Sequence, residues 1–204
     1  MFETLISFSL ATLALAISPG PDNIYVLTQS LINGTKSGIA TTAGLISGCI
    51  VHTSLLAFGI SAIITTSESL FYVIKVLGAC YLLYLAYTVY RSDHTILITS
   101  DAPKKSYWSL FKTGVVMNLL NPKVMIFFLA FFPGFLWDKA GNTVVQFYVL
   151  GLVFMLVSFL VFSAIALLAG RISNVILEKK GIGVFLKWLQ ILVFVGIALY
   201  IIAA

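Results

Sequence analysis

Six long apolar segments, separated by short polar joints, constrain this sequence more than any other feature. Each is longer than the about 20 residues that a helix needs to cross a bilayer. Lipid offers the backbone no hydrogen-bond partner, so such segments must be helical. We therefore predict an all-α integral membrane protein of six transmembrane helices, at approximately residues 4–28, 39–64, 69–90, 107–132, 143–169 and 182–203.

Charged residues are too scarce for a soluble protein. They make up 9% of the 204 residues, whereas 60% are hydrophobic, and a soluble domain carries roughly 25% charged residues. In a soluble chain, a net charge of +5 would suggest binding to nucleic acid. In a membrane protein, the excess is better explained by basic loop residues that set the orientation of the chain in the bilayer. We expect a single membrane transport domain over residues 1–204, with the lipid bilayer as a partner and no nucleic acid.

The basic residues are distributed unevenly between the loops. Of the 12 Lys and Arg residues, Lys75 and Lys123 lie within segments, and the second and fourth loops hold only Lys139. The odd loops and their flanks hold Lys36, Arg91, Lys104, Lys105, Lys112, Arg171, Lys179, Lys180 and Lys187. Because cytoplasmic loops are rich in Lys and Arg, we predict that the odd loops are cytoplasmic and both termini periplasmic.

The two halves of the chain, about 1–100 and about 104–204, carry matching features. Proline motifs interrupt the first segment at Pro19 and Pro21 and the fourth segment at Pro122. With three segments each, the halves must have opposite orientations in the membrane. Inverted repeats with interrupted helices are typical of secondary transporters, which bind substrate at the breaks. We therefore predict two inverted three-helix repeats, with helices 1 and 4 broken at the proline motifs.

These breaks are the predicted substrate-binding site. Proline removes an intrahelical hydrogen bond and clashes with the preceding turn, so two prolines should open helix 1, and Pro122 should open helix 4 more mildly. The freed half-helix N-terminus attracts a carboxylate. A simple structural kink is the alternative at both places. The predicted site comprises Ser18, Pro19, Gly20, Pro21, Asp22, Asn23, Asn118, Asn121, Pro122 and Lys123.

Asp22 and Lys123 follow the breaks directly, one in each half. A charge at membrane depth costs about 2.5 kcal/mol or more, so each needs a partner or water. Asp22 can receive an ammonium group or a proton and Lys123 a carboxylate; a structural Asp22–Lys123 pair is the alternative. The two charges match those of a neutral amino acid, and no further acid lies deep in a segment to receive a basic side chain.

The second segment contributes two further predictions. His52 lies near its middle, and because histidine titrates near neutral pH it can relay protons. Asp22 and His52 are therefore the candidates for carrying a coupled proton, with a hydrogen-bonded core histidine as the alternative. Gly44-x-x-x-Gly48 matches a close-packing motif of membrane helices. It fits packing within the bundle or a contact in a homodimer.

The sequence favours a transporter without enzyme activity, cofactor or metal. Cys49 and Cys80 lie in apolar runs and indicate neither a disulfide framework nor a zinc site. An intramembrane serine protease would need a histidine within reach of its nucleophile, and only His52 and the loop residue His94 exist. A thiol-redox carrier would place one cysteine in each half, whereas both fall in the first half, so this alternative is weaker.

These features resemble the LysE/RhtB family of bacterial amino-acid exporters over almost the whole chain. The motifs that carry the resemblance are Ser18-Pro19-Gly20-Pro21, the glycines and His52 of the second segment, residues 75–82, residues 118–123 and Phe131-Phe132-Pro133. The resemblance implies efflux of L-amino acids or their derivatives, driven by the proton gradient, across a bacterial inner membrane. It does not name one substrate. An exporter of a cation or another small solute on the same fold is the alternative.

Overall fold

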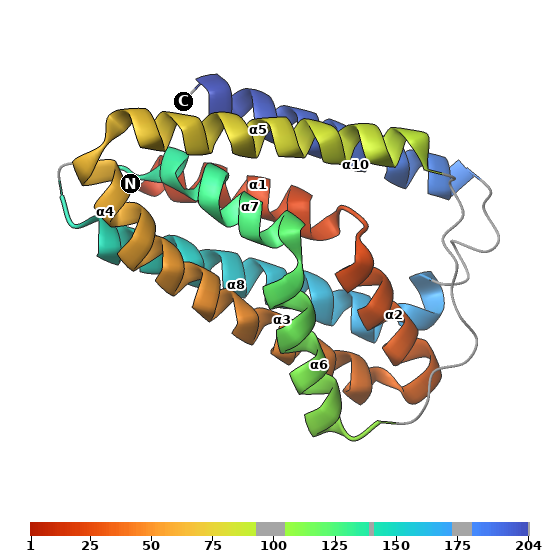
Figure 1. Ribbon diagram of the computed structural model, residues 1–204. Helices are drawn as coiled ribbons and strands as arrows, with labels where there is room; N and C mark the ends of the chain where they lie inside the picture. The colour runs from red at the N-terminus through yellow and green to blue at the C-terminus, as the bar shows by residue number, and fades with distance from the viewer. Residues whose placement is uncertain (93–104, 139–140, 173–180, 204) are drawn as a thin grey trace.

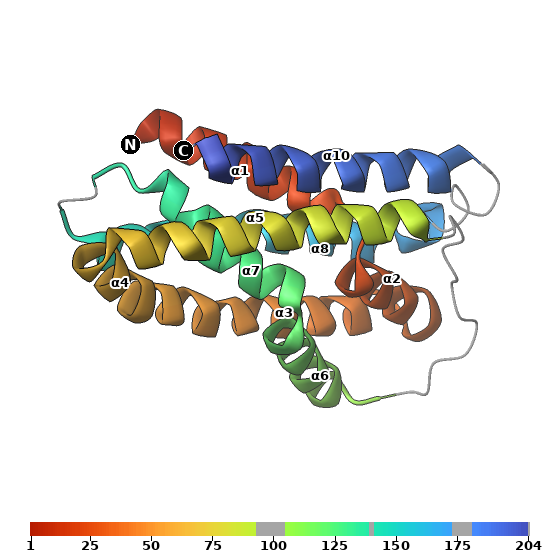
Figure 2. The same cartoon turned by 45° about the horizontal axis from the view of Figure 1, so that its top comes forward.

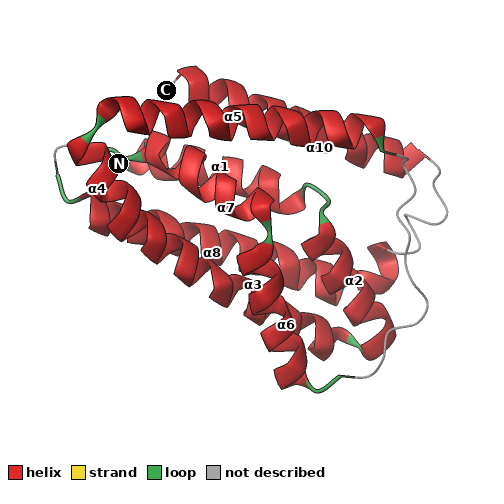
Figure 3. Cartoon of the chain, in the orientation of Figure 1, coloured by secondary structure: helices red, strands yellow, loops and turns green. Residues whose placement is uncertain are grey.

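The chain forms helices joined by loops, with no strand, over the residues that the computed structural model describes: 1–92, 105–138, 141–172 and 181–203 (Figure 3). The helices are α1 (Phe2–Ile17), α2 (Pro21–Asn33), α3 (Thr35–Leu55), α4 (Ser61–Thr66), α5 (Glu68–Arg91), α6 (Tyr107–Leu120), α7 (Pro122–Phe131), α8 (Thr143–Leu167) and α10 (Gly181–Ala203). A π-helical turn η1 (Leu56–Ile60) joins α3 to α4, and a 3-10 turn η2 (Phe132–Phe135) extends α7. The all-α prediction is confirmed.

Four described stretches are long and apolar enough to cross a membrane: α3 with its continuation to Ile63, α5, α8 and α10. Two bent pairs, α1 with α2 and α6 with α7, pass the same test together and bring the number to as many as six. The chain is therefore a multi-pass membrane protein with four to six candidate spans among the described residues.

The first helical segment is longer than predicted. It continues past residue 28 to Asn33, through polar residues that hydropathy assigns to a joint. Gln29 is buried, and Asn33 Nδ2 donates a hydrogen bond to its side-chain oxygen at 2.9 Å. The bundle, rather than lipid, therefore solvates this turn. The helix ends at Gly34, whose φ of 85° is a conformation that favours glycine.

The helices form a bundle with an outer pair on one face. α5 and α10 lie side by side in this pair (Figures 1 and 2). α7 connects the pair to the bundle by packing against α5, where a Cβ added at Gly78 would lie only 2.1 Å from the Cβ of Ala130. Both termini lie at the same end of the molecule (Figure 1), as an even number of crossings would require.

The closest helix crossing in the bundle joins α3 to α6. A Cβ at Gly44 would lie 2.0 Å from the carbonyl oxygen of Phe111, and one at Gly114 would lie 2.4 Å from the carbonyl oxygen of Thr41. Gly48 faces the side chain of Asn118 in the same crossing. The Gly44-x-x-x-Gly48 motif therefore packs within the bundle, and it no longer argues for a homodimer.

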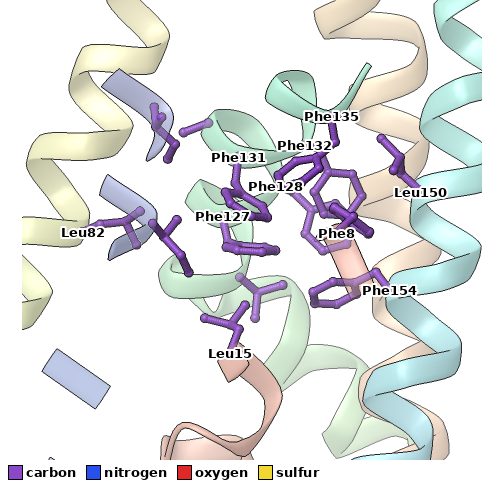
Figure 4. Close-up of a cluster of buried hydrophobic side chains, with 14 of the residues drawn as sticks. Phe8, Leu15, Leu82, Phe127, Phe128, Phe131, Phe132, Phe135, Leu150 and Phe154 are labelled. Atoms are coloured by element: carbon purple, nitrogen blue, oxygen red, sulfur yellow. The ribbon is translucent and has the colours of Figure 1, made fainter. Parts of the chain in front are cut away.

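Phenylalanine side chains fill the core in the half of the bundle that holds the termini (Figure 4). They come from α1, from the run along α7 and η2, and from α8. The fully buried members include Phe8, Phe127, Phe128, Phe131 and Phe132. Ring centroids lie 4.1 Å apart for Phe128 and Phe132 and 4.4 Å apart for Phe127 and Phe131. Such close stacking forms a well-packed aromatic core.

Candidate functional site

The first proline motif breaks its helix completely. α1 and α2 meet at an angle of 60°, with Gly20 in extended conformation and Pro21 as the first residue of α2. Because the chain leaves the helix after Ile17, the carbonyl of Ala16 has no backbone donor from the next turn. The side chain of Asn23 supplies one, since its Nδ2 donates to the Ala16 oxygen at 2.7 Å. This carbonyl of the break is therefore paired from within its own segment.

The second break is only slightly milder than the first, in the direction that the sequence predicts. α6 and α7 meet at 54°, because Asn121 leaves the helix with a ψ of 105° and caps α7 ahead of Pro122. Pro122 has no N–H to donate to the Asn118 carbonyl. That oxygen instead lies 3.1 Å from the Asn121 nitrogen and 3.3 Å from Nε2 of His52. His52, in the tautomer protonated at Nε2, thus completes the hydrogen bonding of the second break.

A single amide joins the two breaks. Nδ2 of Asn121 donates to Oδ2 of Asp22 at 2.9 Å, while Oδ1 of Asn121 accepts from the Lys123 backbone nitrogen at 3.0 Å. The same side chain therefore caps α7 and holds the carboxylate at the start of α2. The matching proline motifs, almost a hundred residues apart in the sequence, form one site.

The two charges occupy equivalent positions with opposite electrostatics. Asp22 and Lys123 are each the second residue of their half-helix. The positive end of a helix dipole stabilises a carboxylate and destabilises an ammonium group. Lys123 Nζ has no carboxylate within 4.0 Å among the residues that the structure describes. It lies over the ring of Phe194, 5.1 Å from the centroid, so the alternative of a contact ion pair with Asp22 is not what the structure shows.

A cavity lies between the breaks, bounded by both half-helix N-termini. Of the predicted site residues, Gly20, Pro21, Asp22, Asn23, Asn118, Asn121 and Lys123 line it. Its volume is about 40 Å³, which is room for a few water molecules. An amino acid is several times larger than a water molecule, so the walls must move apart before the cavity can admit one.

Three predicted residues and His52 lie outside the cavity lining. Ser18 is fully buried, Pro19 lines a neighbouring apolar pocket, and Pro122 is exposed. His52 is buried beside Asn118 and Phe128, with ring centroids 5.4 Å apart for the aromatic contact. Ser18, Pro19 and Pro122 lie at the helix breaks, and His52 bonds a carbonyl freed at the second break. The cavity itself is lined by neighbouring residues.

Other walls of the cavity come from residues that the sequence did not single out. They are Leu15, Ala16, Ile46, Cys49, Val124, Phe154, Ser158 and Phe162. The wall residues from α3 and α8 lie in long apolar runs of the sequence. A lone serine or cysteine in such a run does not by itself indicate a binding site. A search for small polar residues in the middle of the segments could have found Cys49 and Ser158, among many others.

Comparisons with known proteins identify the family of this chain. The family model of the LysE type translocators matches residues 13–204. The homoserine/homoserine lactone efflux protein of Salmonella typhimurium is 31% identical over 172 residues, covering 84% of this chain and 83% of that protein. The protein of the same name from Salmonella typhi matches with the same identity and coverage. No solved structure matches the chain. The chain therefore belongs to the family of LysE-type translocators.

Proposed function

We propose that this protein is a secondary active exporter of neutral L-amino acids, and that the substrate binds in the cavity between the two helix breaks. Membership of the translocator family and the similarity to homoserine/homoserine lactone efflux proteins support export of an amino acid or a close derivative. The observation that carries the proposal is a buried acid and a half-buried base on one cavity, without a contact ion pair between them.

Each end of an amino acid has a partner in this cavity. The substrate ammonium group pairs with the carboxylate of Asp22, which Asn121 holds in place. The substrate carboxylate pairs with the Lys123 ammonium group, at the positive end of the α7 dipole. The substrate carboxylate also offsets the unfavourable interaction between the Lys123 ammonium group and the positive end of its helix.

The same charges favour a neutral side chain over a basic one. Asp22 is the only acidic residue within the predicted segments, apart from Glu68 and Glu3 near segment ends. A lysine or arginine substrate would bring a second cation that finds no carboxylate at that depth. Leaving such a charge unpaired is costly. The substrate is therefore a neutral amino acid with an aliphatic or small polar side chain.

The fold and the charge distribution support a proposal about the wider arrangement of the chain. We propose that residues 1–204 form one transport domain of six spans in two inverted repeats, with each bent helix pair as a single span. The described basic residues Lys36, Arg91, Lys105, Arg171 and Lys187 lie at or near helix ends remote from the termini. This distribution supports a cytoplasmic position for that end and periplasmic termini, in a bacterial inner membrane.

Export against a gradient requires a driving force, and we propose that it is the proton gradient. Asp22 lies on the cavity, where it can alternate between a proton and the substrate ammonium group. His52 lies off the cavity and donates to the Asn118 carbonyl, which supports a structural part for it. Asp22 is therefore the better of the two candidates for the coupled proton.

Transport into inside-out membrane vesicles tests the proposal. Vesicles containing the protein should accumulate labelled leucine, threonine or homoserine when a pH gradient is imposed, and excess lysine or a monovalent cation should not compete. Asp22→Asn and Lys123→Gln should each abolish accumulation while the protein still inserts. Lys112→Gln, which removes an exposed lysine from α6, is the matched control. Competition by lysine as strong as that by leucine would contradict the neutral-substrate proposal, and competition by cations alone would favour a cation exporter.

A further inference from the structure

The wall of the cavity opposite the charged breaks has a distinct chemistry. α8 contributes Phe154, Ser158 and Phe162 to it, spaced one helical turn apart, and α3 contributes Ile46. Phe154 and Phe162 are buried. Ser158 therefore places one hydroxyl between two aromatic rings on a wall that is otherwise apolar.

The hydroxyl of Ser158 differs from those of many serine and threonine residues in these helices. In a helix, such hydroxyls commonly donate to the carbonyl four residues earlier. The residues that do so here are Ser9, Ser30, Ser37, Thr41, Ser47, Thr53, Ser54, Thr88 and Thr113. Ser158 is 3% exposed, and its hydroxyl forms no hydrogen bond with any residue that the structure describes.

Ser158 also differs from the buried hydroxyls that have no room for a ligand. The oxygens of Thr12, Ser18, Thr42 and Ser163 are unpartnered too, but none of these residues lines the cavity. Ser158 combines burial, a free hydroxyl and access to the cavity. A buried polar group that stays unpaired is unfavourable, so a ligand that pairs with it is favoured over one that does not.

We propose that Ser158 selects the substrate by its side chain, and that the preferred substrates carry a hydroxyl or similar small polar group on a short side chain. This inference rests on the proposed function, because it takes the two substrate charges to be bound at Asp22 and Lys123. With its charged groups held at the breaks, an amino acid directs its side chain toward the wall of α3 and α8. There the side-chain hydroxyl hydrogen-bonds to Ser158, and the adjacent methylene groups contact the two rings.

The proposal predicts a preference between substrates of equal size. Threonine and valine differ by a hydroxyl in place of a methyl group, and homoserine and norvaline differ in the same way. A site built to bind a hydroxyl can reject the apolar analogue strongly, but Ser158 can also turn back to its own helix carbonyl when no partner is present. We therefore expect about a tenfold preference for the hydroxyl-bearing member of each pair in kcat/KM.

The experiment measures these two ratios in vesicles for the wild type, Ser158→Ala and Ser163→Ala. Ser158→Ala should reduce both ratios to near one, by raising KM for threonine and homoserine more than KM for valine and norvaline. Ser163→Ala removes an unpartnered hydroxyl on the same helix, away from the cavity, and should keep the wild-type ratios. Ser158→Thr should retain the preference.

Two outcomes would overturn the inference. One is that Ser158→Ala keeps the wild-type ratios; the other is that it slows both members of each pair equally, as a purely structural residue would. In either case Asp22→Asn and Lys123→Gln would still abolish transport if the proposed function is right. Normal transport by those two variants would instead contradict the proposed function itself.

Discussion

The two helix breaks occupy matching places in the two halves of the chain but differ in how they are stabilised. In the first, Asn23 of the same segment pairs a freed carbonyl, and the carboxylate is one that the helix dipole favours and that Asn121 holds. The second borrows His52 from another helix, and carries an ammonium group that the dipole opposes. The charge of the first break is thus already paired within the protein, whereas the second break gains stability when an anion binds. A substrate carboxylate is the anion that the proposed function supplies.

Restoring either helix should have the largest effect on transport. The combined change Pro19→Ala, Gly20→Ala and Pro21→Ala removes the residues that interrupt helix 1, and Pro122→Ala does the same for helix 4. An internal proline costs a helix about 3 kcal/mol or more, so alanine should favour a continuous helix in each case. We expect each variant to insert but to lose at least about 100-fold of its transport rate. Normal transport by either variant in vesicles would show that its break is only a kink.

Removing the charge at one break should change the stability of the protein in a different direction from removing the charge at the other. Lys123→Gln removes a disfavoured ammonium group, so its thermal stability in detergent should rise or stay equal. Asp22→Asn removes a favoured carboxylate, and should lose about 1 kcal/mol of stability. Both should lower transport by at least about 30-fold, since a hydrogen bond to a charged group contributes about 1.5–3 kcal/mol. Melting curves that fall equally for both variants would contradict the proposed difference between the breaks.

Cys49 offers a direct probe of the space between the breaks. It lines the cavity, and its sulfur lies 3.8 Å from Oδ1 of Asn118 at the second break. In a Cys80→Ser background, substrate at ten times its Kd should slow modification of Cys49 by a small thiol reagent about tenfold. A Cys49→Ser variant that keeps the exposed Cys80 of α5 should show no protection. Equal protection of both cysteines would place the substrate outside this cavity.

Much of this architecture could be predicted from the sequence. Long apolar runs set the helices because lipid forces the backbone to bond within each segment, and the prolines marked both breaks. Asp22 and Lys123 were found because a charge at membrane depth is rarely without a role. The end of α2 was misjudged because polar residues such as Gln29 are solvated by other helices, which a hydropathy pattern does not register.

Contacts between distant helices could not be predicted in this way. The bond from Asn121 to Asp22 depends on how the two half-helices meet. Ser158 reaches the cavity because of the rotation of α8 about its axis, and an almost uniformly apolar helix leaves that rotation undefined in the sequence. The position of His52 beside the Asn118 carbonyl depends on the glycine crossing of α3 and α6. Each of these depends on side-chain packing across the bundle, rather than on local pattern.

The smallest effect on transport is expected for His52 and Asn23, the two side chains that donate hydrogen bonds to carbonyls freed at the breaks. Variants of these residues test the comparison most closely. Gln can donate to the Asn118 carbonyl as His52 does, so His52→Gln should transport within about threefold of the wild type. His52→Leu leaves that carbonyl with a poorer set of donors, and should lose about 1–3 kcal/mol of stability. Asn23→Leu should lose a similar amount at the first break, where the Ala16 carbonyl would be left without its side-chain donor.

These variants also decide between a structural and a proton-carrying role for His52. Glutamine keeps the hydrogen bond but cannot take up a proton at physiological pH. If His52 serves the helix break, His52→Gln retains transport that depends on the pH gradient, and Asp22→Asn does not. If His52 relays the coupled proton, His52→Gln uncouples transport from the gradient while its thermal stability stays at the wild-type value. The second result would assign the coupled proton to His52 instead of Asp22. The second break, rather than the first, would then be the site of energy coupling.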